Sequence, residues 1–190
     1  DYIVERFDYN GVKIWGVQYG WIKFEEAFNI ALYANKLYII GTTGNALGTY
    51  KGQEDAFVAS YDINGNFLWL KQFGTDSTEF GKSIAVNANG VHCVGYTSGH
   101  FFGTSNGSND GYTFKLDHLG NPIWINQFGT PASNVSDINY FVSNDPTGIY
   151  TTGLYKGSYK HGPNVGTEEV FIKKYAHSTS SSVTWETILN

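Results

Sequence analysis

The sequence predicts an all-β fold, and three observations support this prediction. A unit of 54 to 61 residues repeats along the chain, as the spacing of Trp15, Trp69, Trp124 and Trp185 shows. Inside each unit apolar and polar residues alternate with the period of two that strands have, and no stretch keeps a helical period. Four short strands per repeat of this length are typical of one blade, so the sequence predicts a partial β-propeller of four-stranded antiparallel blades.

The predicted elements follow one another along the chain as a single β-propeller region, 1–190. Residues 1–19 form the outer hairpin of an incomplete blade, and three full blades span 25–73, 80–128 and 136–189. By resemblance to related propellers, the first strand of each full blade is expected to lie innermost, and the other three follow outward in chain order. Aromatic residues make up 17% of the chain and 23 residues are Gly, which suits many short strands joined by tight turns.

Two hairpin turns are expected in each full unit. Asn64-Gly65 supplies the two residues with positive φ that a type I′ turn needs, and the second hairpin of the next unit turns at 87–90. The segment EEAFNIALYANK (25–36) looks helical in isolation, but its repeat equivalents predict a strand. The segment DINGN (62–66) is predicted to be a hairpin turn rather than a calcium loop, because its oxygen ligands are too few.

The repeat unit reads D-A-F-V-x-x-Y-D-x-N-G-N-x-x-W-x-x-Q-F-G-T, followed by S-I-A-V-x-x-x-G-V-x-x-V-G-Y-T. This pattern resembles the SBBP type of β-propeller repeat. The resemblance covers nearly the whole chain, is best in residues 55–130, and departs at Glu169, at Ala176 and in the HSTSSS segment (177–182). It implies a propeller fold in a protein that is often secreted or displayed at a cell surface, and it implies no common catalytic residues.

Three and a half blades do not close a ring, because propellers need about 4–8 blades. An unclosed row leaves apolar edges open to unwanted strand pairing. The covering blades come either from further residues of the same polypeptide or from copies of the chain, as a dimer or a filament. Both alternatives predict that residues 1–19 and 136–189 contact another blade or another chain.

Composition and motifs argue against several classes of function. The net charge of −5 disfavours nucleic acid and anionic membranes as partners, and no apolar run is long enough for membrane insertion. The one cysteine, Cys93, lies in an alternating apolar run and is expected to be a buried, inert thiol. The five histidines lack metal-ligand spacing, and no catalytic motif is present. We therefore expect no enzyme activity, no catalytic residues, no cofactor and no metal site.

Residues that recur in every unit are expected to serve the fold. The four repeated Trp residues are predicted to pack one blade against the next rather than to bind a ligand. Asp55 and Asp110 occupy equivalent positions and are predicted to fix local turns through side-chain to backbone hydrogen bonds.

Binding residues are expected where the repeat is broken, in loops that share one face of the predicted blades. Aromatic residues among Gly, Ser, Thr and Asn suit sugar stacking or a protein partner. The alternative is that these rings tuck under their own loops. The candidate ligand-binding residues are Trp21, Phe24, Tyr50, Phe101, Phe102, Tyr155 and Tyr159, and Asn106 and Asn134 lie in glycosylation sequons.

The sequence thus favours a non-enzymatic β-propeller scaffold of an extracellular or cell-surface protein, with a structural or adhesive role. It assembles by completing blades or strands with its own polypeptide or with other copies. The alternative is a carbohydrate-binding, lectin-like propeller that uses the aromatic loop face, with a glycan as its partner.

Overall fold

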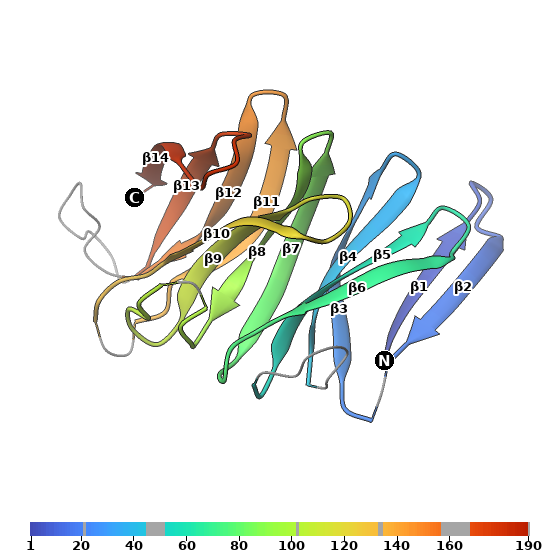
Figure 1. Cartoon of the computed structure of the whole chain (residues 1–190), viewed down its shortest axis with the longest axis horizontal. Coiled ribbons are helices and arrows are strands. Elements are labelled where there is room, and N and C mark those ends of the chain that lie inside the picture. The colour runs from blue at the N-terminus through green and yellow to red at the C-terminus, as the bar shows by residue number, and fades with distance from the viewer. Residues whose placement is uncertain (21, 45–51, 102, 133–134, 157–167, 190) are drawn as a thin grey trace.

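The computed structural model describes residues 1–190 except 21, 45–51, 102, 133–134, 157–167 and 190. In this part of the chain there are strands and no helix, arranged as one two-stranded and three four-stranded antiparallel sheets. The sheets stand side by side in a row that does not close (Figure 1). The predicted all-β fold, a partial propeller built of blades, is confirmed.

Each sheet is given a name from here on. The N-terminal hairpin consists of β1 (Tyr2–Phe7) and β2 (Lys13–Tyr19). The first blade consists of β3 (Glu25–Tyr33), β4 (Lys36–Thr43), β5 (Asp55–Asp62) and β6 (Phe67–Phe73). The second blade consists of β7 (Glu79–Asn87), β8 (Gly90–Thr97), β9 (Asp110–Leu116) and β10 (Pro122–Phe128). The third blade consists of β11 (Ile138–Asp145), β12 (Gly148–Tyr155), β13 (Glu169–Tyr175) and β14 (Val183–Leu189).

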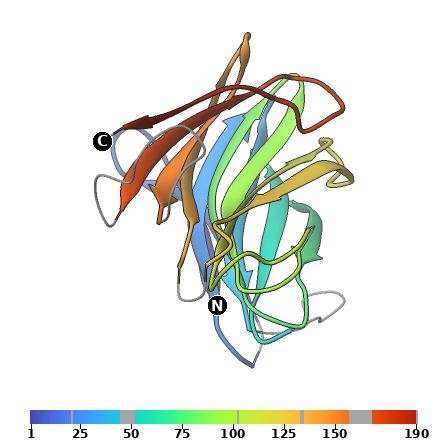
Figure 2. The same ribbon diagram turned by 90° about the vertical axis from the view of Figure 1, so that its left-hand side faces the viewer.

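Strand order within the blades agrees with the prediction. Every four-stranded sheet is hydrogen-bonded in chain order, so that β7 pairs with β8, β8 with β9 and β9 with β10. The first strands of the three blades, β3, β7 and β11, are neighbours in space. Seen from the end of the row, the third blade turns its outward face to the viewer (Figure 2). The segment that looked helical in isolation forms β3 and the first residues of the next turn and strand.

The hydrophobic core lies between blades. Tyr38 and Ile40 of the first blade share one buried cluster with Val91, Cys93 and Phe114 of the second. Cys93 is completely buried, as predicted, and burial raises the pKa of its thiol. Because each blade buries its faces only against its neighbours, the faces at the two ends of the row have no such cover in the described structure.

A glycine in the second strand of each blade makes room for a β-bulge in the first strand. The bulges lie opposite Gly41, Gly95 and Gly153. A Cβ atom at Gly95 would collide with the carbonyl oxygen of Phe80 and would lie 2.5 Å from the hydroxyl oxygen of Tyr112. The recurring Gly of the IIGTT, CVGYT and TTGLY segments therefore follows from backbone packing.

The predicted type I′ turn at Asn64-Gly65 is wrong. Only Gly65 has a positive φ, +86°, while the pair with two positive φ values is Ala34-Asn35. The reason is local, because the carboxylate of Asp62 accepts the backbone N–H of Asn64 at 2.8 Å and favours a type I turn followed by a left-handed glycine.

The repeated Asp and Gln-Phe-Gly residues form a clamp between the third and fourth strands. Gln72 Nε2 donates to Asp55 Oδ2 at 2.6 Å, and Gln127 Nε2 donates to Asp110 Oδ2 at 2.7 Å. A Cβ atom at the Gly that follows Gln-Phe, as at Gly129, would collide with the aspartate. The repeated aspartates were expected to act through side-chain to backbone hydrogen bonds, and this side-chain clamp adds to that role.

Candidate functional site

The same kind of hydrogen bond occurs at each of the three junctions between neighbouring sheets. The indole N–H of one blade donates to a carbonyl oxygen in the outer hairpin of the next: Trp15 to Ile63 at 3.1 Å, Trp69 to His118 at 3.1 Å and Trp124 to Ser178 at 3.3 Å. These three residues confirm the prediction that the repeated Trp packs blade against blade.

Trp185 departs from that pattern. Its side chain is 43% exposed, whereas Trp124 is 7% exposed. Its indole contacts Tyr150 of its own blade edge-on, with ring centroids 6.2 Å apart. No further blade covers the outward face of the third blade in the described structure, so Trp185 does not occupy an inter-blade core position there.

The hairpin turn on which each Trp packs is also repeated. One copy, in the N-terminal hairpin, has no Trp against it. At Gly65 and Gly120 an added Cβ atom would lie 2.9 Å from the ring of Trp15 and of Trp69, respectively. Gly11 occupies the equivalent place in the N-terminal hairpin and has a similar φ of +79°, yet nothing lies within 4 Å of its Cβ position. The hairpin turn 8–12 thus has the shape of a Trp-receiving turn with no Trp on it.

The outward face of the N-terminal hairpin is apolar and open to solvent. Ile3 and Phe7 occupy the repeat positions of Phe57 and Tyr61, which are completely buried against the preceding sheet. Ile3 is 61% exposed and Phe7 is 50% exposed. We call Ile3, Phe7, Ile14 and the turn 8–12 the N-terminal end face.

The opposite end of the row is apolar as well. Exposed Phe141, Val170 and Trp185 lie on the third blade, and a shallow groove of about 210 Å³ runs between Phe141, Tyr150 and Ile172. We call Phe141, Tyr150, Val170 and Trp185 the C-terminal end face. The two end faces are the two sides of the kind of junction that is filled three times inside the chain.

A further groove separates the N-terminal hairpin from the first blade. It measures about 290 Å³ and lies between β1 and β3, and its lining includes Ile3, Val4, Phe28 and Ile30. In the described part of the chain β1 is hydrogen-bonded only to β2, so its other edge presents unpaired backbone groups. This is where the two inner strands of a complete blade would stand.

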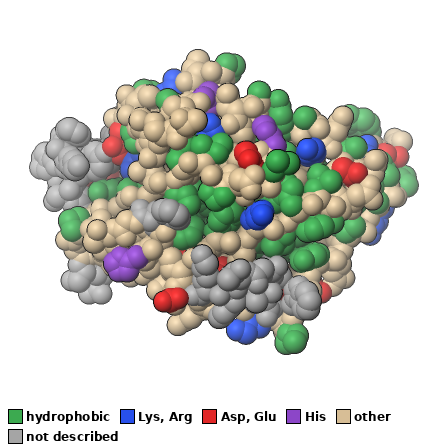
Figure 3. All heavy atoms as spheres, viewed as in Figure 1, with side chains coloured by type: hydrophobic (Ala, Val, Ile, Leu, Met, Phe, Trp, Pro, Cys, Tyr) green, Lys and Arg blue, Asp and Glu red, His purple; other side chains and the backbone are tan. Residues whose placement is uncertain are grey.

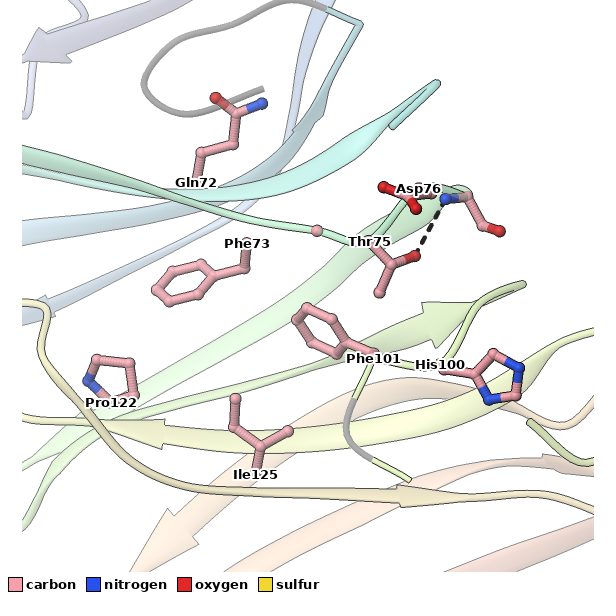
Figure 4. Close-up of a pocket in the computed structure, with 10 residues that line it drawn as sticks. Gln72, Phe73, Thr75, Asp76, His100, Phe101, Pro122 and Ile125 are labelled. Atoms are coloured by element: carbon pink, nitrogen blue, oxygen red, sulfur yellow. Dashed lines mark hydrogen bonds between the residues drawn. The ribbon is translucent and has the colours of Figure 1, made fainter. Parts of the chain in front are cut away.

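A wider depression lies on the flank of the row, between the first and second blades. It has a volume of about 650 Å³, and its side chains come from β6, β10 and the loops beside them (Figure 4). Hydrophobic side chains reach the surface near the middle of this side of the molecule (Figure 3). The apolar lining consists of Phe73, Phe101, Pro122 and Ile125, and the polar lining includes Gln72, Thr75, Asp76, Ser77 and His100.

The candidate binding aromatics do not form one cluster in the described structure. Phe24 is exposed beside Gly44, while Phe101 is buried against Tyr112 with ring centroids 5.0 Å apart. Tyr155 is partly buried, at the end of β12. The remaining four, Trp21, Tyr50, Phe102 and Tyr159, lie outside the described residues.

The two sequons are placed unequally. Asn106 is half-buried, and its backbone N–H donates to Asp110 Oδ2 at 2.9 Å, which is the predicted action of this aspartate on the backbone. Asn134 lies outside the described residues. Of the described residues that line the flank depression, only Phe101 was predicted from the sequence as a binding candidate. Gln72, Phe73 and Ile125 were missed because they belong to the repeat and were assigned to the fold.

The third blade replaces an apolar contact by an ion pair. Lys173 Nζ lies 3.0 Å from Glu186 Oε1 and 3.3 Å from the ring centroid of Phe128. The equivalent cross-strand pair in the second blade is Phe114 with Ile125. Burial lowers the pKa of Lys173 to about 7, and the charge of Asp137 opposes that shift. No group of three or more His, Cys, Asp or Glu residues suited to a metal ion occurs in the part of the chain that is described.

The pH dependence of stability should report on His92. Burial lowers the pKa of this side chain to about 3, and the charge of Lys115 adds to the shift. Below the ordinary His pKa of about 6.5, the unfolded chain binds a proton that the folded chain does not, so the free energy of unfolding falls as the pH falls. We expect this group to contribute a loss of about 1 kcal/mol per pH unit toward pH 4, measured by urea unfolding.

The His92→Gln variant isolates that contribution. Burial raises the pKa of Glu79 and Asp137, so their contributions to stability change with pH in the opposite sense. Both groups are present in the variant and cancel in the difference from the wild type. Parallel pH profiles of the two proteins would show that His92 is not the group responsible.

Comparison with known proteins gives one informative similarity. No protein-family model matches the chain. The chain is 29% identical over 102 residues to an uncharacterized WD repeat-containing protein of Acanthamoeba polyphaga mimivirus. The match covers 54% of the chain and 7% of that much longer protein. In the described residues no helix is long and apolar enough to cross a membrane. The similarity and the four sheets together support a repeat of the β-propeller type.

Proposed function

We propose that the chain is a non-enzymatic protein-interaction scaffold whose two end faces bind β-blades. The observation that carries the proposal is the exposure of Ile3 and Phe7 at repeat positions that are buried at the internal junctions. The extracellular or cell-surface setting, with a structural or adhesive role, is the setting that resemblance to SBBP-type repeats implies.

Buried apolar area and strand pairing both favour the binding of a β-blade at the end faces. Full burial of one large apolar side chain stabilises an interface by roughly 1.5–3 kcal/mol, and each end face offers at least three such side chains. The free edge of β1 adds backbone groups that a partner strand can pair with. Apolar patches flanked by an open strand edge are typical of surfaces that bind other β-structures.

A photo-crosslinking amino acid placed at Phe7 tests this function, with the same residue at Phe67 as the matched control. The two side chains are equally exposed, at 50% and 49%, but Phe67 lies on the first blade and stacks on Tyr19 at the inner side of the N-terminal hairpin, so it belongs to neither end face. We expect the Phe7 position to crosslink, in material from the natural source, to a peptide with a β-blade repeat. Equal labelling at both positions, or none at either, would contradict the proposal.

The flank depression favours a second candidate, the carbohydrate-binding propeller. Phe73, Pro122 and Ile125 offer an apolar floor for a sugar ring, and Asp76 and His100 offer hydrogen-bonding groups at its rim (Figure 4). A glycan array probed with the wild type and with Asp76→Ala tests it. Selective glycan binding by the wild type that is lost in Asp76→Ala supports this candidate. An array on which the wild type binds no glycan contradicts it.

A further inference from the structure

We infer that residues 1–190, where no further blade covers their end faces, associate head to tail, with each end face bound to the opposite end face of a second copy of this chain. In the contact, Trp185 of one copy lies on the hairpin turn 8–12 of the other, and its indole N–H donates to the carbonyl oxygen of Tyr9. The inference rests on the proposed function and names the partner.

The acceptor is identified by repeat equivalence. Trp15 donates to Ile63, the residue after Asp62, and Trp69 donates to His118, the residue after Asp117. The residue at that place in the N-terminal hairpin is Tyr9, which follows Asp8.

The receiving turn is already formed in the single chain. Asp8 Oδ1 accepts the backbone N–H groups of Asn10 and Val12, each at 2.8 Å. Asp62 and Asp117 make the same pair of hydrogen bonds in the two turns that do receive a Trp. The turn 8–12 therefore needs no rearrangement to accept an indole ring.

Each end face lacks the part of a blade junction that the other end face has. Gly11 has nothing within 4 Å of its Cβ position, whereas Gly65 and Gly120 are covered by an indole ring. Trp185 is exposed, whereas Trp69 and Trp124 are covered by the next blade. The C-terminal end face thus has an indole ring with no turn to pack on, and the N-terminal end face has a receiving turn with no indole ring on it. A second copy supplies what each face lacks.

The contact also covers the apolar residues around it. On the N-terminal end face, Ile3 and Phe7 stand where Phe57 and Tyr61 meet the preceding sheet. On the C-terminal end face, Val170 stands at the repeat position of Ala56, which is completely buried at a filled junction. Because the same repeat positions meet at every junction, head-to-tail packing brings these side chains together.

Sedimentation velocity on the purified chain, over a wide range of concentration, tests the inference with two variants. Trp185→Ala damages the C-terminal end face, and Phe7→Glu damages the N-terminal end face. We expect the wild type to associate, and each variant alone to associate at least about tenfold more weakly, as for a central aromatic residue of an interface. Phe67→Glu, at an equally exposed position that belongs to neither end face, should leave association unchanged.

Mixing the two variants separates a head-to-tail contact from other contacts. Phe7→Glu keeps a sound C-terminal end face and Trp185→Ala keeps a sound N-terminal one, so the mixture should form heterodimers at concentrations where neither variant alone associates measurably. A contact of one face with itself gives no such rescue. Circular dichroism confirms that both variants fold.

Three results would overturn the inference: a wild type that stays monomeric at every concentration, association that Trp185→Ala leaves intact, or a mixture that does not rescue. If the wild type stays monomeric while the crosslinker at Phe7 still labels a β-blade of another protein, the proposed function stands and the second copy is excluded as the partner.

Discussion

Replacing Trp124 by Ala is expected to lower the free energy of unfolding by about 3–5 kcal/mol, the usual cost of truncating a large buried aromatic side chain. The indole is 7% exposed, stacks on Tyr175 with ring centroids 5.6 Å apart, and donates to the carbonyl oxygen of Ser178. The variant loses the contact between two blades and leaves a cavity at their junction. Urea unfolding followed by circular dichroism measures the change.

The matched control for Trp124→Ala is Phe67→Ala. Phe67 is also an aromatic residue in a blade, but it is 49% exposed, so we expect a loss of about 1 kcal/mol or less. If both variants lose the same free energy, the repeated Trp is not a core residue of the blade junction.

Replacing Gly95 by Ala is expected to cost about 3 kcal/mol, at the upper end of the range for overpacking a core. The added Cβ atom would collide with the carbonyl oxygen of Phe80 in the β-bulge and lie 2.5 Å from the hydroxyl oxygen of Tyr112. Relief of the collision requires β7, the first strand of the second blade, to move away from β8. Thermal or urea unfolding of the variant measures the loss.

Gly11→Ala is the control for Gly95→Ala. Gly11 has a positive φ but nothing within 4 Å of the added atom, so only backbone strain of about 1 kcal/mol is expected in dilute protein. A Gly95→Ala variant as stable as Gly11→Ala would mean that the bulge does not approach β8 as closely as described.

Most of the fold could be predicted because the same sequence pattern recurs in each blade. The spacing of Trp15, Trp69 and Trp124, together with alternation inside each unit, was enough for strand order and blade packing. The turn at Asp62 was predicted wrongly, because a dipeptide rule for Asn-Gly ignores the carboxylate that caps the turn from outside the dipeptide. The fate of Trp185 depends on whether a blade follows it in space, which a repeat pattern does not encode.

The candidate sites were harder to predict for a physical reason. The flank depression forms where Phe73 of one blade faces Ile125 of the next, and both residues also serve the repeat. The end faces are defined by position in the row, so Ile3 reads in the sequence like the buried Phe57. Loop aromatics were sought instead, and Phe101 among them packs inward against Tyr112.

Hydrogen exchange of the Trp indole N–H groups, followed by NMR and assigned through single Trp→Phe variants, tests whether one hydrogen bond recurs at every blade junction. We expect slow exchange for Trp15, Trp69 and Trp124, whose N–H groups are donated across blade junctions. For Trp185 we expect fast exchange in dilute protein and slower exchange as the concentration rises. Fast exchange of Trp69 and Trp124, at the rate of Trp185 in dilute protein, would contradict the repeated junction from which the account is built.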